Sequence, residues 1–320
     1  MLSRVAERLY WTGRYLERAE DTARIINVHS NLLLDLPKGM TLGWAPLIAL
    51  FGNAEAYARL HAEADEHSAM RFMLAEYGNP SSILSSLHQA RENLRTSRDV
   101  VPREAWEKLN QIYQYVKLQA EHGVARHARY EFLTRVIDGC QLIVGLFSGT
   151  MSRDQAYDFL RVGRNLERAD MTSRIIDVRS ADLLVGHTAD LTPFATIQWM
   201  SVLKSLSAHQ MYRRHVHVRV RGPEVLSFLL KDPHFPRSVV HCLGEVQQSL
   251  GNLVRNEVPR RHAIRLKRHV QHVDLQDLLR EGLHEFIDRL QIGLGRLHER
   301  IQMTYFLNRA PAPRSRSIAA

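Results

Sequence analysis

The hydrophobic and polar positions at the start of the chain follow the period of an α-helix. Apolar or small residues recur at alternating spacings of three and four, which places them on one stripe of a helix that turns about 100° per residue. Ser3 is a good N-cap and Pro37 and Gly39 interrupt the pattern, so we predict a helix over residues 3–35. The stripe consists of Val5, Leu9, Thr12, Leu16, Ala19, Ala23, Ile26, Ser30 and Leu33.

The same pattern returns 150 positions later. Residues 13–30, GRYLERAEDTARIINVHS, and residues 163–180, GRNLERADMTSRIIDVRS, are identical at 12 of 18 positions. Agreement of this length at a constant offset indicates a duplicated unit, and we predict a second long helix over residues 152–185. Small residues lie in the middle of both stripes, so we expect the two helices to pack closely there. These residues are Ala19, Ala23, Ala169 and Ser173.

A second segment is also repeated, at an offset of 156. Residues 72–87 and 228–243 share Phe, Leu, Pro, Ser and Leu at matching positions. The intervening patterns are helical, and the alternating run HVHVRVR at 215–221 is predicted to be the frayed exit of a helix or an extended connector rather than a strand. We therefore predict an all-α fold, a helical bundle of two tandem repeats related by a pseudo-twofold axis. The repeats span 1–150 and 151–307, and a disordered basic tail follows at 308–320.

The other face of each long helix carries charge between two apolar stretches. In the first helix it is apolar at Tyr10 and Trp11 and again from Ile25 onwards. A solvated face would be polar along its whole length, so we predict that both charged blocks are buried. Buried charges must be paired or must bind something. The candidate site residues are Arg14, Glu17, Arg18, Asp21 and Arg24 in the first copy and Arg164, Glu167, Arg168 and Arg174 in the second.

Two interpretations of these blocks remain open. In the first, Glu17 and Glu167 neutralise arginines across the pseudo-twofold axis and fix how the halves dock. In the second, the blocks form one site with a net charge of +3, which suits a carboxylate or phosphate group on a ligand or acidic peptide. Direct catalysis is the weaker functional interpretation, because arginines lower the pKa of a neighbouring glutamate and make it a poor general acid and a weak base.

The two long segments resemble the signature helices of the bacterial alpha-E family. LSRVAERLYWTGRYLERAEDTARIINV and MSRDQAYDFLRVGRNLERADMTSRIIDV carry the resemblance, and the family's Glu-Arg motif maps onto Glu17-Arg18 and Glu167-Arg168. The resemblance implies a tandem-duplicated helical protein without an established activity. It also implies association with circularly permuted ATP-grasp ligases and transglutaminase-like proteins in peptide synthesis or modification. Asp21, answered by Met171, departs from the symmetry of the two copies.

Composition narrows the remaining choices. The 320 residues carry a net charge of +9, which favours an acidic partner, but nucleic acid is unlikely because we find no recognition motif. The apolar runs are too short or interrupted to span a membrane and there is no secretory segment, so we predict a cytoplasmic protein. Two cysteines and isolated histidine–acid pairs such as His61 and Asp65 suggest neither a metal site nor a cofactor.

Two functions of different classes follow from these observations. The first is a non-catalytic helical adaptor that works with an ATP-grasp-type ligase and transglutaminase-like proteins and has a central Glu/Arg anion-binding site. The alternative is an enzyme of the same pathway with its active site at the Glu-Arg blocks. We find no complete nucleotide, metal or nucleophile motif, which favours the adaptor over an enzyme that acts on its own.

Overall fold

All regular structure in the described part of the chain is helical. The computed structural model describes residues 1–35, 43–51, 54–184, 192–216, 219–275, 277–278 and 282–307, and it describes no side chains at 34–35, 179–184 and 192–194. The predicted tail at 308–320 lies outside these residues. The all-α fold class is therefore confirmed.

The described helices range in length from 6 residues in α2 to 33 residues in α1. In order they are α1 Ser3–Asp35, α2 Ala45–Leu50, α3 Ala54–Leu60, α4 Glu66–Leu74, α5 Ile83–Arg95, a 3-10 turn Arg98–Val100, α6 Arg103–Gly123, α7 Arg126–Thr150, α8 Gln155–Leu184, α9 Thr192–Ser205, α10 His209–Val216, α11 Gly222–Lys231, α12 Val239–Gly251, α13 Glu257–His272 and α15 Leu283–Tyr305.

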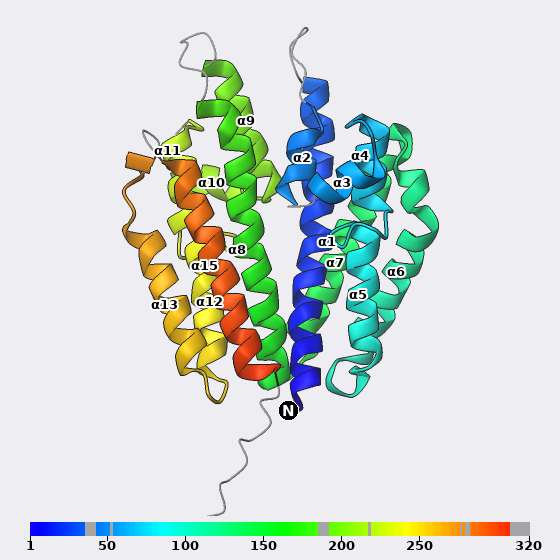
Figure 1. The fold of residues 1–320 in the computed structure, drawn as a ribbon, viewed down its shortest axis with the longest axis vertical. Helices are drawn as coiled ribbons and strands as arrows, with labels where there is room; N and C mark the ends of the chain where they lie inside the picture. Colours follow the sequence, from blue (N-terminus) through cyan, green and yellow to red (C-terminus); the bar gives the residue numbers. More distant parts are fainter. Residues whose placement is uncertain are drawn as a thin grey trace, which may run out of the picture.

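Two long helices, α1 and α8, run side by side through the middle of the molecule (Figure 1). Both ascend in the same direction, and their mutual contact is the most extensive between any two described helices. Helices α5, α6 and α7 lie on the α1 side, and α12, α13 and α15 lie on the α8 side. The charged faces of α1 and α8 are thereby placed at the centre of the bundle.

Local sequence signals agree with the starts of several helices. The predicted helix over 3–35 agrees with α1, and α8 begins three residues later than predicted, at Gln155. Ser82 and Ser238 cap α5 and α12, each accepting a hydrogen bond from the backbone N–H three residues on, at 3.0 and 3.1 Å. Helix α5 thus begins at Ile83, directly after its cap.

The close approach of α1 and α8 occurs at two glycines and not at the small-residue stripes. A Cβ on Gly13 would lie 2.3 Å from the Leu160 carbonyl oxygen, and one on Gly163 would lie 1.9 Å from that of Tyr10. At 100° per residue, Ala19 and Ala23 lie on the side of α1 opposite Gly13, Arg14 and Glu17. The expectation that α1 and α8 pack near Ala19, Ala23, Ala169 and Ser173 is therefore wrong. These four buried residues face other parts of the core.

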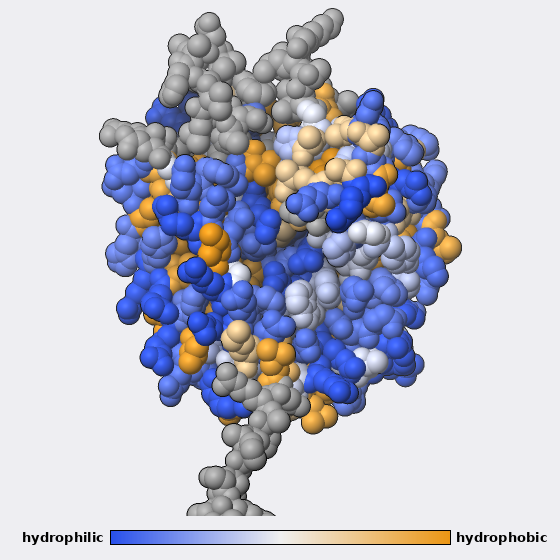
Figure 2. Space-filling model, in the orientation of Figure 1, coloured by the Kyte–Doolittle hydropathy of each residue, from blue (hydrophilic) through white to orange (hydrophobic). Residues whose placement is uncertain are grey.

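Helix α7 combines length with an apolar composition. By length and composition alone, the helix Arg126–Thr150 could span a membrane. The same properties are typical of core helices, and α7 contributes Phe132, Val136 and Ile143 to the core against α1 and α6. The face of the molecule in Figure 2 is mainly hydrophilic, with apolar residues in small groups.

Candidate functional site

The central charges form reciprocal ion pairs between α1 and α8. Arg168 of α8 donates from Nε and NH2 to the two carboxylate oxygens of Glu17 in α1, at 2.7 and 2.8 Å. In the opposite sense, Arg14 and Arg18 of α1 donate through Nε to Glu167 of α8, both at 2.5 Å. Both glutamates are essentially inaccessible to solvent, with exposed fractions of 0% and 1%. Each helix therefore supplies the carboxylate that neutralises arginines of the other.

Arg237 completes the centre from outside the two long helices. It lies just before α12, and its guanidinium contacts Glu17 at 2.8 Å, Glu20 at 2.9 Å and Asp21 at 2.6 Å. The Arg237 carbonyl oxygen also accepts a hydrogen bond from Thr172 in α8, at 2.9 Å. One arginine thus connects three carboxylates of α1 to the segment that leads into α12.

The arginines keep both motif glutamates ionised despite their burial. Burial alone would raise the pKa of Glu17, but Arg168 and Arg237 lower it to about 2. The pKa of Glu167 is likewise raised by burial and lowered to about 2 by Arg14 and Arg18. A carboxylate of this kind does not take up a proton near neutral pH, so neither glutamate is suited to be a general acid or base.

Asp21 differs from the two glutamates. Burial raises the pKa of Asp21 to about 7. Arg237 lowers this pKa, but the negative charges of Glu17 and Glu20 raise it and offset part of that effect. Oδ1 of Asp21 accepts from Arg237, whereas Oδ2 has no hydrogen-bond partner among the described residues. Three carboxylates compete here for one shared guanidinium, and Asp21 is the one that most readily holds a proton.

Aromatic side chains enclose Arg14 at the other side of the centre. Arg14 lies 5.3 Å from the Trp11 ring centroid and donates to the Tyr10 hydroxyl at 3.4 Å. Burial raises the pKa of Tyr10 to about 12. The pKa of His298 is lowered to about 4, first by burial and then by the positive charge of Arg14. Tyr10 therefore keeps its proton, and its hydroxyl shares a hydrogen bond of 2.8 Å with Nδ1 of the neutral His298, which links α1 to α15.

Besides Asp21, which pairs with Arg237, three of the predicted site residues do not join the pairs between α1 and α8. Arg24 pairs with Glu20 of its own helix at 2.8 Å, and Arg174 pairs with Asp170 at 2.8 Å while also reaching the Leu50 carbonyl oxygen at 3.3 Å. Arg164 has no hydrogen bond or ion pair to any described residue, and its Nε is buried without a partner. Burial and the charge of Arg168 lower the pKa of Arg164. It occupies the position in α8 that Arg14 occupies in α1.

Sequence reasoning missed Glu20, Asp170 and Arg237. Glu20 and Asp170 are acidic at matching positions of the two copies, so a comparison by charge rather than identity would have found them. At the offset of 156, the residue that corresponds to Arg237 is Ser81, so the repeat does not mark Arg237 as a site residue. With these residues included, seven arginines face five carboxylates and the net charge is +2 instead of +3 when all are ionised.

Other reactive side chains lie apart from this centre. Burial raises the pKa of the Cys140 thiol well above its usual value and that of Cys242 to about 12, so both thiols stay protonated near neutral pH. On the surface, His284 of α15 lies 2.7 Å from Asp177 of α8 and 3.7 Å from Asp288, a cluster the sequence did not suggest. Asp177 raises the pKa of His284, consistent with an ion pair between α8 and α15.

Comparisons with known proteins place this helical arrangement in a family. Three uncharacterized proteins, one from Mycobacterium bovis and two from Mycobacterium tuberculosis, are each 22% identical over 275 residues. The match covers 78% of this chain but 30% of each relative. No solved structure matches significantly. The model of the Alpha-E family, described as a predicted alpha-helical domain with a conserved ER motif, matches residues 1–306, and the chain belongs to that family.

Proposed function

We propose that this protein is a non-catalytic helical adaptor whose two halves are held together by the Glu-Arg centre. The observation that carries the proposal is the reciprocal pairing of Glu17 with Arg168 and of Glu167 with Arg14 and Arg18. Both carboxylates are buried, ionised and already bonded to arginines, so they are poorly placed to exchange protons with a substrate. The alternative of an enzyme with its active site at these blocks is therefore disfavoured.

We further propose that the protein consists of two tandem repeats, 1–150 and 151–307, related by a pseudo-twofold axis. The repeated sequence supports this, and so does the exchange of partners at the centre. Glu17 and Arg168 form one pair, and the residues at the matching positions of the other copy, Glu167 and Arg18, form another. Gly13 and Gly163 also occupy matching positions at the close approach of α1 and α8.

The proposed partners follow from the family resemblance. We propose a cytoplasmic protein that acts with an ATP-grasp-type ligase and transglutaminase-like proteins in peptide synthesis or modification. The net charge of +9 favours an acidic surface on such a partner. Within the centre, Arg164 is the group we propose for contact with an anion, because its guanidinium has no partner among the described residues.

Reconstitution with a ligase tests the adaptor proposal. We expect the purified protein to form a complex with an ATP-grasp-type ligase of the same organism in size-exclusion chromatography with light scattering. Ligation should be faster with the complex than with the ligase alone, and the protein alone should show no turnover. Turnover by the protein alone, or a ligase that neither binds it nor responds to it, would contradict the proposal.

A variant of the centre makes the same experiment specific to the structure. Glu17→Gln disturbs the docking of α1 and α8, whereas Glu107→Gln removes an exposed carboxylate on α6 whose partner Arg103 is 86% exposed. We expect the first variant to weaken both complex formation and stimulation of the ligase, and the second to behave as the parent. If the two variants bound and stimulated the ligase equally, the adaptor role would not depend on the Glu-Arg centre.

A further inference from the structure

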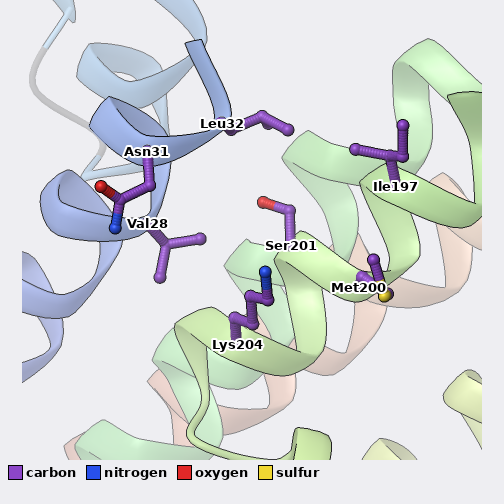
Figure 3. Close-up of a pocket in the computed structure, with 7 residues that line it drawn as sticks. All are labelled: Val28, Asn31, Leu32, Ile197, Met200, Ser201 and Lys204. Atoms are coloured by element: carbon purple, nitrogen blue, oxygen red, sulfur yellow. The ribbon is translucent and has the colours of Figure 1, made fainter. Parts of the chain in front are cut away.

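A cavity of about 270 Å³ lies between α1 and α9, away from the Glu-Arg centre (Figure 3). Val28 and Leu32 of α1 and Ile197 and Met200 of α9 supply apolar walls. Val28 and Leu32 extend from α1 toward α9 across the space. Val28, Ile197 and Met200 are only half-buried, so apolar surface remains uncovered inside the cavity.

Ser201 lies in this cavity without a hydrogen-bond partner. Its residue is 3% exposed, and its Oγ is buried and bonded to no described group. In Figure 3 the hydroxyl extends from α9 toward α1, into the space bounded by Val28 and Leu32. A buried hydroxyl is normally satisfied, because leaving it unpaired costs free energy. The Ser201 hydroxyl is therefore free to bond a polar group of a ligand in the cavity.

Lys204 supplies a positive charge one helical turn from Ser201. Its side chain is exposed, forms no ion pair with the described residues, and places Nζ near the same gap between α1 and α9. An ammonium group and a hydroxyl that point into one apolar cavity are complementary to an anionic acceptor joined to an aliphatic chain. A carboxylate can accept from both donors, and such charge-assisted bonds are strong.

We propose that this cavity binds a small aliphatic carboxylate, with the carboxylate between Ser201 and Lys204 and the hydrocarbon chain between Val28, Leu32, Ile197 and Met200. The volume sets the size of the ligand. An apolar cavity of about 150 Å³ can hold benzene, so about 270 Å³ suits a chain of roughly eight carbons. This inference does not depend on the adaptor role, since it involves none of the residues of the Glu-Arg centre.

Calorimetric titration with octanoate tests the proposal, with octylamine and octanol as probes of equal chain length. We expect saturable binding of octanoate and affinities at least about tenfold weaker for the other two, since one charge-assisted contact corresponds to about that factor. Lys204→Gln should weaken octanoate binding about tenfold, and Ser201→Ala should weaken it severalfold. Lys117→Gln, which removes an exposed lysine from α6, should bind octanoate as the parent does.

Nuclear magnetic resonance of methionine methyl groups locates the ligand. Octanoate should shift the Met200 signal, assigned with Met200→Leu, and should leave the signal of the exposed Met303 on α15 unchanged. Thermal melts of each variant verify that it is folded. The proposal is overturned by the absence of saturable binding, by equal affinities for octanoate and octylamine, or by equal effects of Lys204→Gln and Lys117→Gln. The proposal is also overturned if octanoate shifts the methyl signal of Met303 and leaves that of Met200 unchanged.

Discussion

Arg237 donates a 2.6 Å hydrogen bond to Asp21, which lies 216 positions earlier in the chain. Neither residue has a counterpart in the other copy, where Met171 and Ser81 occupy the matching positions. The negative charge that Asp21 adds to α1 is thus matched by the positive charge of Arg237. Because Arg237 also bonds to Glu17, it takes the place that Arg164 would fill in a symmetric arrangement. The two halves therefore have unequal electrostatics around equivalent glutamates.

Removing the charge of either motif glutamate should destabilise the protein strongly. Glu17→Gln leaves Arg168 and Arg237 buried with fewer partners, and Glu167→Gln does the same to Arg14 and Arg18. We expect each variant to lose about 3–5 kcal/mol of unfolding free energy, as is typical when one partner of a buried ion pair is removed. Urea denaturation measures this value.

An exposed carboxylate provides the control for these variants. Glu107 pairs with Arg103 on the surface of α6, where both side chains are more than half exposed. Glu107→Gln should change the free energy of unfolding by less than about 1 kcal/mol. If Glu17→Gln and Glu107→Gln unfolded at the same urea concentration, the central pairs would not stabilise the docking of α1 and α8.

The glycines at the close approach of α1 and α8 should be intolerant of any side chain. A Cβ at Gly13 or Gly163 would collide with backbone atoms of the facing helix, which cannot move as a flexible side chain can. We expect Gly13→Ala and Gly163→Ala each to cost at least about 1–3 kcal/mol, the range for overpacked cores. Thermal unfolding followed by circular dichroism measures the loss.

Two other helical glycines serve as matched controls. Gly145 in α7 and Gly295 in α15 have nothing within 4 Å of the position of a Cβ. Gly145→Ala and Gly295→Ala should therefore stabilise the protein by about 0.5–1 kcal/mol, because alanine favours the helix. If Gly13→Ala also stabilised the protein, α1 and α8 would have to lie farther apart than they do in the structure.

Helix periodicity and the internal repeat were sufficient to predict the fold class and the long helices. The span of α1 follows from Ser3 and from the break at Pro37, and the charged face between apolar stretches indicated that the Glu-Arg blocks are buried. These are local or periodic properties, so a single sequence contains them. The face that packs against the other long helix was assigned wrongly, because alanine and glycine both permit close packing and periodicity does not choose between them.

Long-range partners were the part that the sequence could not provide. Arg237 reaches the centre because the cap at Ser238 positions the start of α12 beside α8, a tertiary relationship without periodic signature. The pairing of Arg24 with Glu20 within one helix, rather than across the centre, depends in the same way on which carboxylates the arginines reach in the folded protein. Spacing alone treated all nine candidate residues as equivalent.

Stability should depend on pH through Asp21. Its pKa is about 7 in the folded protein and near 3.8 in an unfolded chain, so the folded state retains a proton that the unfolded state releases. The stabilisation due to this proton is complete below about pH 4 and is lost as pH rises through about 7. Asp21→Asn imitates the protonated form and keeps the acceptor for Arg237. We expect the free energy of unfolding of this variant to be larger than that of the parent by on the order of 2 kcal/mol at about pH 8. Near pH 4 the two values should be equal.

Urea denaturation of both proteins across this pH range provides the measurement. Asp177→Asn is a suitable comparison, because Asp177 is half-buried at an ion pair with His284 outside the centre. Asp177→Asn should not be more stable than the parent at any pH in this range, because it loses the pair with the protonated His284 and gains nothing when His284 is neutral. If Asp21→Asn were less stable than the parent at pH 8, Asp21 would be ionised in its pair with Arg237 and its pKa would lie below neutral.

The two equivalent arginines, Arg14 and Arg164, should respond differently to the same substitution. Arg14→Gln removes a bond to the buried Glu167 and should cost about 1–3 kcal/mol, the range for a hydrogen bond to a charged group. Arg164→Gln removes a desolvated guanidinium that has no partner in the described part of the chain, and it should leave the free energy of unfolding within about 0.5 kcal/mol of the parent, or raise it. Thermal shift with inorganic phosphate then tests anion binding: phosphate should stabilise the parent and Arg14→Gln, but not Arg164→Gln. Equal stabilisation of all three proteins would assign the anion to another site, and equal destabilisation by both substitutions would mean that Arg164 has a structural partner after all.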